Sequence, residues 1–121
     1  MQAGNTLLIP SGKDGNHLFF CVLGPKILAG KNCVLLVPLC TVRAGHDPSC
    51  YVGPGDHPFL RHDSFIDYRY LRVDLVEEIE KKLGSTYFGV SENASQQLLD
   101  RIQAGLKVSK RVKGFIKDDW F

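Results

Sequence analysis

The stretch most informative about the fold is Cys33-Val34-Leu35-Leu36-Val37-Pro38-Leu39, in which every side chain is apolar. A short, continuous apolar run predicts a central strand that is buried on both faces of a sheet. The turn-like residues Ala29-Gly30-Lys31-Asn32 precede it. Working outward, we expect earlier strands at Thr6–Ile9, ended by Pro10, and at His17–Leu23, ended by Gly24-Pro25, with a turn over Ser11–Asn16 between them.

The middle of the chain continues with strand patterns. Ser49–Val52 is a possible short strand, and Ser64–Val73 alternates partly between apolar and polar side chains, which predicts a longer one. Short strands followed by helices favour an α+β domain, here a small antiparallel barrel or curled sheet with helices at one end.

A first helix is expected after residue 73. Asp74 and Glu77 have the spacing of a capping box, and Gly84 suits a C-terminal cap. Apolar residues recur between them at every fourth position, namely Leu75, Ile79 and Leu83. A continuation of the preceding strand over Val73–Val76 is the alternative.

A second helix is expected over Ser91–Leu106. Its apolar residues form one stripe at helical spacing: Ala94, Leu98, Ile102 and Leu106. From about residue 107 the chain alternates basic and apolar residues, which suits either a short helix or an arm packed on the body. The basic residues there are Lys107, Lys110, Arg111, Lys113 and Lys117.

Length and composition indicate one ordinary globular domain over residues 1–121. The chain has 121 residues, 44% of them hydrophobic and 23% charged. Its net charge of +2 is too small to indicate nucleic-acid binding by itself, although a local patch matters more than the total. Residues 1–9 lack the features of a signal peptide, and no apolar run approaches the length of a membrane span. We therefore expect a cytoplasmic protein without membrane contact.

The segment Gly55-Asp56-His57-Pro58-Phe59-Leu60-Arg61-His62-Asp63 holds the densest set of chemically active side chains. Its Gly55 and Pro58, with Gly53 and Pro54 before it, predict an irregular surface loop. An imidazole beside a guanidinium and a carboxylate can exchange protons near neutral pH and stabilise an anion. The alternative is a polar loop that only caps a strand.

Three stretches resemble the PemK/MazF/Kid family of bacterial toxins. Val34–Thr41 resembles the family's apolar strand, which ends in Val-Pro shortly before a Thr. Arg61-His62-Asp63 is similar to its Arg-x-Asp motif, and Ser64–Arg69 is similar to the Ile-Asp-hydrophobic-basic stretch that follows. The helix expected over Ser91–Leu106 falls where the family has its last helix.

The resemblance implies a small SH3-like barrel with C-terminal helices and a toxin of a toxin-antitoxin pair. Such a toxin is a metal-independent endoribonuclease that cleaves single-stranded RNA, uses no cofactor, forms a homodimer and is inhibited by an antitoxin protein. The products would be a 2′,3′-cyclic phosphate and a 5′-hydroxyl.

The resemblance also implies roles for single residues. Arg61 matches the catalytic Arg that grips the scissile phosphate, Asp63 is the candidate base or orienting group, and His17 lies in the loop where Kid-like enzymes place a His. His62 is the side chain in the motif most able to carry protons near pH 7. The RNA-contacting residues would be Thr41, Arg43, His57 and Arg69.

Structural roles remain open for each of these residues. The structural alternatives are a surface Arg61 paired with Asp63 or Asp67, an Asp63 that acts as an N-terminal cap, and a His17 that hydrogen-bonds to the backbone.

Two other functions fit the same residues. Cys50, His57 and His62, with Asp47 nearby, are possible zinc ligands by type, although no cysteine pair has Cys-x-x-Cys spacing. The second alternative is a non-catalytic SH3-like module that binds a peptide or RNA, with the histidines in structural roles.

Overall fold

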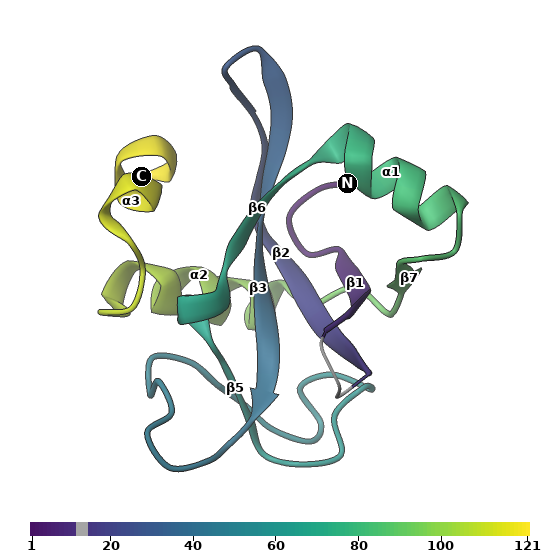
Figure 1. Cartoon of the computed structure of the whole chain (residues 1–121). Coiled ribbons are helices and arrows are strands. Elements are labelled where there is room, and N and C mark those ends of the chain that lie inside the picture. Colours follow the sequence, from purple (N-terminus) through teal and green to yellow (C-terminus); the bar gives the residue numbers. More distant parts are fainter. Residues whose placement is uncertain (12–14) are drawn as a thin grey trace.

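The computed structural model describes residues 1–11 and 15–121, and the turn expected over Ser11–Asn16 lies partly outside them. Within those residues the chain forms strands and helices in the order β1 Thr6–Pro10, β2 Asn16–Leu28, β3 Lys31–Thr41, β4 Tyr51–Val52, β5 Ser64–Ile66, the 3-10 helix η1 Tyr68–Tyr70, β6 Arg72–Leu75, α1 Val76–Gly84, β7 Gly89–Val90, α2 Gln96–Val108 and α3 Gly114–Trp120. Figure 1 shows the helices arranged around a strongly bent sheet.

The sheet is antiparallel and open. Its strand order is β4-β5-β3-β2-β1-β7, and β6 pairs with β3 beside this path. Among the described residues no pairing joins β4 to β7, each of which has only two residues. The α+β class is therefore confirmed, and the sheet is open and bent in place of the closed barrel that the resemblance implies.

The central strand is β3, as the apolar run predicts. Residues 33–39 are all buried. One edge of β3 pairs with β2, and the other edge pairs first with β6 at Cys33–Leu36 and then with β5 at Leu39–Thr41. Burial on both faces explains why this strand has no polar alternation.

Strand β2 continues past Gly24-Pro25 to Leu28, so the predicted end at Leu23 is wrong. The pairing of β2 with β3 shifts its register between Cys21 and Lys26, and this irregularity accommodates Gly24 and Pro25. Gly24 has φ +111°, and a Cβ there would lie 2.8 Å from the carbonyl oxygen of Cys33. Only glycine accepts both the conformation and the close approach.

The single long strand predicted over Ser64–Val73 is wrong, because the chain turns in its middle. Oδ1 of Asp67 accepts a hydrogen bond from the Arg69 backbone N–H at 3.2 Å, which caps η1. The side chain of Tyr68 is fully buried and its hydroxyl donates to the Ile102 carbonyl at 2.7 Å. The turn moves the chain from one end of β3 to the other.

The helix predicted after residue 73 is confirmed as α1, which ends at Gly84. The capping box does not form, because Asp74 instead accepts two hydrogen bonds from Arg72 at 2.7 and 2.8 Å.

Helix α2 begins five residues later than Ser91, because the Ser95 hydroxyl caps it by accepting from the Leu98 N–H. The tail forms the short helix α3, one of the two alternatives.

The core covers both faces of the sheet. The larger cluster joins Leu98, Ile102 and Leu106 of α2, with Ile116 and Trp120 of α3, to apolar residues of β2 and β3. The smaller cluster packs Ile79 of α1 and Phe88 against the other face. Among the described residues, no helix has the length and hydropathy needed to cross a membrane.

Gly105 of α2 provides a test of this packing. A Cβ at Gly105 would overlap the hydroxyl of Tyr68 and lie 3.0 Å from Cβ of Cys50. We expect Gly105→Ala to lower the free energy of unfolding by about 1–3 kcal/mol through overpacking, despite the better helix propensity of Ala. Urea denaturation measures the change. Gly84→Ala is the control, because nothing lies within 4 Å of its added Cβ; equal stability of the two variants would contradict close packing at Gly105.

Candidate functional site

A cleft of about 500 Å³ opens where the start of β2, the end of β3 and the loop before β5 meet. It gathers five residues that the sequence indicated as functional, His17, Thr41, Arg43, Arg61 and His62. The other described residues of its lining are Asn16, Leu18, Leu39, Cys40, Phe59, Leu60 and Ser64. Three separate segments of the chain thus share one surface because β2, β3 and β5 are neighbours in the sheet.

His17 lies on β2 opposite Ile9. Its Nδ1 is buried and makes no hydrogen bond to the described part of the protein. The residue as a whole is half-buried and lines the cleft, where an imidazole can take part in proton exchange.

Arg61 and His62 reach the cleft together because the chain is irregular before β5. In an extended strand, neighbouring side chains would point to opposite faces. Both side chains are exposed, and Nη1 of Arg61 donates only a long hydrogen bond, 3.4 Å, to the Pro58 carbonyl. The Phe59 ring, 42% exposed, lines the same cleft.

The loop that carries Arg61 and His62 is held in place by His57 and Asp56. His57 is 2% exposed; its Nε2 donates to the Glu92 carbonyl at 2.6 Å and its Nδ1 accepts from the Phe59 N–H at 3.1 Å. Asp56 accepts from the Gly53 N–H at 2.7 Å and pairs with Arg101 of α2 at 3.1 Å. The hydrogen bond from Gly53 lowers the pKa of Asp56 the most, and the contact with Arg101 lowers it further.

Three residues indicated by the sequence lie outside the cleft lining. Both ring nitrogens of His57 are occupied by the backbone, so it has a structural contact in place of the RNA contact expected. Asp63 is exposed and its side chain lies beside Gly53. A Cβ added to Gly53 would be 3.7 Å from Oδ1 of Asp63. Arg69 pairs with the buried Asp67 at 3.0 Å and faces a different hollow. Arg61, by contrast, makes no ion pair in the described part of the chain.

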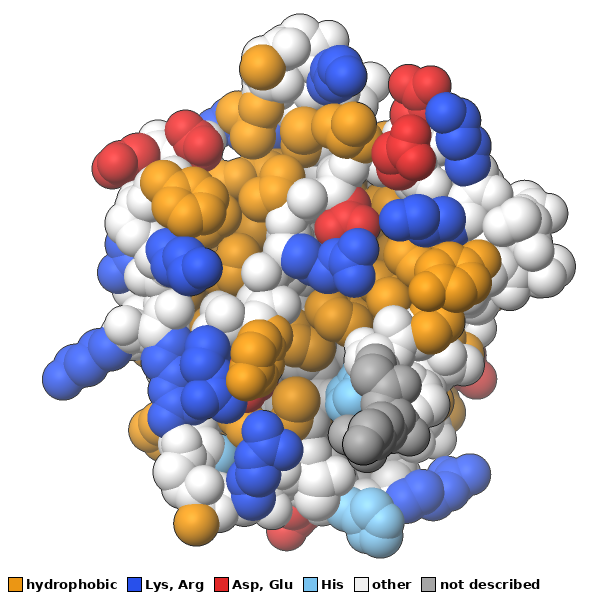
Figure 2. Space-filling view, viewed as in Figure 1, with side chains coloured by type: hydrophobic (Ala, Val, Ile, Leu, Met, Phe, Trp, Pro, Cys, Tyr) orange, Lys and Arg blue, Asp and Glu red, His pale blue; other side chains and the backbone are white. Residues whose placement is uncertain are grey.

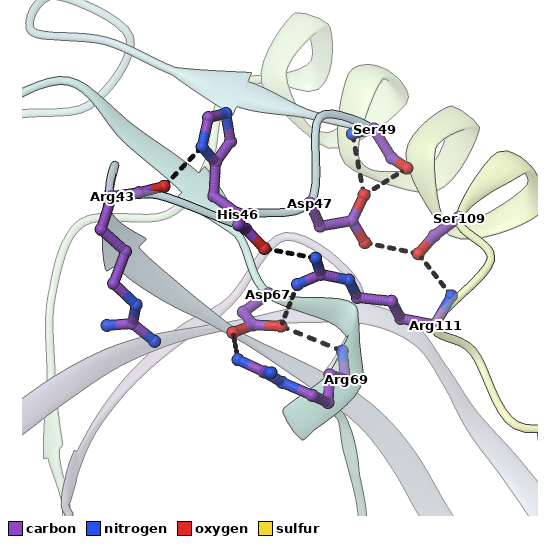
Figure 3. A network of polar contacts seen from close by, with 9 residues as sticks. Arg43, His46, Asp47, Ser49, Asp67, Arg69, Ser109 and Arg111 are labelled. Atoms are coloured by element: carbon purple, nitrogen blue, oxygen red, sulfur yellow. Dashed lines mark hydrogen bonds and ion pairs between the residues drawn. The ribbon is translucent and has the colours of Figure 1, made fainter.

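A polar network fixes the loop between β3 and β4 (Figure 3). Nδ1 of His46 donates to the Arg43 carbonyl at 2.7 Å, and Nη2 of Arg111 donates to the Gly45 carbonyl at 2.5 Å. Arg111 also lies 4.0 Å from Asp67. The segment after α2 therefore holds the loop on which Arg43 stands, and this contribution of Arg111 has no local signal in the sequence.

Asp47 is the buried acid of this network. It is 2% exposed and accepts from the Ser109 hydroxyl at 2.5 Å and from the hydroxyl and N–H of Ser49 at 2.6 and 3.0 Å. Burial alone would raise the pKa of Asp47, but these hydrogen bonds and the charge of Arg111 outweigh it and lower the pKa. The carboxylate therefore stabilises the native state while it is ionised.

The cysteines are free thiols. Burial raises the pKa of Cys50 and raises that of Cys21 to about 12, which makes both poor thiolate ligands at neutral pH. Among the described residues, no group of three His, Cys, Asp or Glu side chains is close enough to hold a metal ion. The zinc site expected from Cys50, His57 and His62 is not assembled there.

The sequence did not single out Cys40, Ser64 or Asn16 as parts of the site, whereas Phe59 is among the aromatic residues that it offers for stacking on a base. Cys40 and Ser64 enter the site through the pairing of β3 with β5, in which Thr41 lies opposite Ser64. Asn16 had a signal, since it adjoins His17 at the end of a predicted turn.

Comparison with known proteins adds no assignment. No family model, no curated protein and no solved structure matches this chain. The class of protein must therefore be inferred from the site itself.

The two histidines of the loop separate structural from functional roles. We expect His57→Ala to lower the free energy of unfolding by about 1–3 kcal/mol, because it removes a buried ring together with its hydrogen bonds to the Glu92 carbonyl and from the Phe59 N–H. His62→Ala should change it by less than about 0.5 kcal/mol, because His62 is exposed. Urea denaturation of both variants measures this contrast, and a loss of stability in His62→Ala alone would reverse the assignment.

The lowered pKa of Asp47 gives a pH dependence of stability. Its contribution is present above about pH 4, the range of an unfolded Asp, and is lost as the pH falls through the lower native pKa. We expect Asp47→Asn to cost about 1–3 kcal/mol at pH 7 and less at pH 2.5. The control is Asp118→Asn, at an exposed position. A difference between wild type and Asp47→Asn that does not shrink in acid would contradict the network.

Proposed function

We propose that this protein is a metal-independent endoribonuclease that cleaves single-stranded RNA, and that it belongs with the PemK/MazF/Kid-like toxins. The observation that carries the proposal is the cleft itself. Two histidines and two arginines, His17, His62, Arg43 and Arg61, line one surface although they come from separate parts of the chain.

These residues supply what metal-free RNA cleavage requires. A base removes the proton of the ribose 2′-hydroxyl, the 2′-oxygen bonds to phosphorus, and the P–O5′ bond breaks as an acid protonates the leaving oxygen. The products are a 2′,3′-cyclic phosphate and a 5′-hydroxyl. In the proposal His17 and His62 exchange the two protons.

The arginines act on charge. In the pentacoordinate transition state negative charge increases on the non-bridging phosphate oxygens, and a guanidinium can donate two hydrogen bonds to them. Arg61 is assigned this role and Arg43 holds an adjacent phosphate. Phe59 offers a surface on which an unpaired base can stack. Asp63 is left out of proton exchange because it does not line the cleft.

The fold supports the family proposal through its central strand. In β3 one edge pairs with β2 while the other pairs with β6 and β5, which gives the bent sheet expected of an opened SH3-like barrel. The proposal includes the partners of that family, namely a second copy of this chain and an inhibitory antitoxin, and a cytoplasmic site of action. The non-catalytic binding module remains the alternative.

The test is cleavage of a defined single-stranded RNA in EDTA, with analysis of the product ends. We expect cyclic-phosphate ends and a rate about 10²–10³-fold lower for Arg61→Ala. Lys31→Ala is the matched control, because it also removes one exposed positive charge but lies at the far end of β3 from Thr41. Its activity should equal that of the wild type.

Each other result has a definite meaning. Cleavage that Arg61→Ala leaves unchanged would reject the assigned site. Binding of RNA without cleavage would favour the non-catalytic module. Activity that appears only when zinc is added would reject a metal-independent mechanism.

A further inference from the structure

A second hollow lies beside the cleft, between η1, β6 and α3. Its volume is about 170 Å³, and it is lined by Tyr68, Arg69, Leu71, Val73, Lys113, Phe115 and Ile116. Of these described lining residues two are cationic and none is acidic. Phe115 is 59% exposed. Tyr70, which follows Arg69 in the chain, is 55% exposed. Figure 2 shows basic and hydrophobic side chains lying next to each other on the side of the molecule where η1 and α3 lie.

Arg69 is oriented by its neighbours. The buried Asp67 accepts from its Nη2 at 3.0 Å, and the guanidinium carbon lies 4.6 Å from the centroid of the Tyr70 ring. The charge of the buried Asp67 is offset by Arg69 and by Arg111, which lies 4.0 Å from it. The side chain of Arg69 remains 48% exposed. A guanidinium beside an aromatic ring is suited to a phosphate flanked by stacked bases.

The hollow lies near the cleft on the side of Cys40 and Arg69. Cys40 lines the cleft, whereas Arg69 lines the hollow. Burial and Asp67 raise the pKa of the Cys40 thiol, and the charges of Arg43 and Arg69 act against this rise. Figure 3 shows both arginines in the same region as Asp67, to which Arg69 is bound. One guanidinium group thus stands at the cleft and another at the hollow.

We propose that this hollow is a nucleotide subsite for the RNA strand that flanks the bond being cut. The base of one unpaired nucleotide enters it and stacks on Phe115, while Arg69 and Lys113 contact the phosphates on either side. This inference rests on the proposed function, because the subsite would bind the same RNA strand that is cut in the cleft.

The size and chemistry of the hollow fit this occupant. A cavity of ~150 Å³ accepts a benzene ring, so the hollow has room for one planar ring. Stacking tolerates every base because each has a π-face, and the arginine and lysine recognise the backbone without reading sequence. The subsite would therefore add affinity for longer RNA and leave the choice of cleaved bond to the cleft.

Binding of a non-cleavable RNA tests the subsite separately from catalysis. The probe is a mixed-sequence 2′-O-methyl octanucleotide, which lacks the attacking hydroxyl, with binding followed by fluorescence anisotropy. We expect Phe115→Ala to weaken binding about tenfold and Lys113→Ala to reduce the salt dependence by about 0.7 in slope. Tyr87→Ala is the matched control, because Tyr87 is 58% exposed and adjoins β7 at the far end of the sheet.

Cleavage of two RNA lengths completes the test. A dinucleotide fills only the cleft, so Phe115→Ala should cleave it at the wild-type rate while raising KM for an octanucleotide. Equal octanucleotide affinity in the Phe115→Ala and Tyr87→Ala variants would overturn the subsite, and cleavage in EDTA would then still support the nuclease. Binding that depends on Phe115 without any cleavage would retain the subsite and reject the nuclease. Tighter binding of an acidic peptide than of the octanucleotide would assign the hollow to a protein partner and overturn the proposal.

Discussion

The burial of β3 on both faces is the constraint on which the rest of the structure depends. Residues 33–39 lie between two apolar clusters, one under α2 and α3 and one under α1. A strand in this position can satisfy its backbone only through neighbours on both edges. Those neighbours are β2 on one side and β6 with β5 on the other, and their arrival at the two ends of β3 bends the sheet. The cleft forms at the end where β5 pairs.

Three of the catalytic candidates, Arg43, Arg61 and His62, stand on irregular segments that polar contacts hold to the helical part of the molecule. His57 joins the loop before β5 to the chain ahead of α2, and Arg101 of α2 holds the same loop through Asp56. Ser109 and Arg111 do the same for the loop after β3. Chemically active loops on a rigid sheet gain a defined geometry in this way without losing solvent access. The basic tail is thus part of the site's support.

Under the proposed function, the cleft and the neighbouring hollow would divide two tasks, cleavage of the RNA and binding of the strand beside the cut. The cleft combines groups able to exchange protons with groups able to stabilise negative charge. The hollow combines one exposed aromatic ring with two cations, a composition suited to stacking and backbone contact. Arg69 belongs to the hollow, although its closeness to Arg61 in the sequence suggests a place in the cleft. The ion pair with Asp67 holds the Arg69 side chain at the hollow.

Local patterns gave much of the secondary structure. The apolar run over 33–39 is short and bounded by turn residues, as a buried strand requires, and Leu98, Ile102 and Leu106 recur at helical spacing. The errors came where a tertiary contact outweighed the local signal. The close packing of Gly24 on Cys33 lets β2 pass a Gly-Pro pair, and the buried Tyr68 with the capping Asp67 breaks a strand that alternates in the sequence.

The sequence by itself determined the α+β class, the central strand, the main helices and the residue types able to perform the chemistry, because these follow from short-range periodicity and composition. Only the tertiary structure decided which of those residues meet. It brought His17 to Arg61 and His62, occupied both nitrogens of His57, and kept Asp63 and Arg69 out of the cleft. Strand pairing between segments far apart in the chain and the partners of each polar atom set that outcome, and neither is encoded in local spacing.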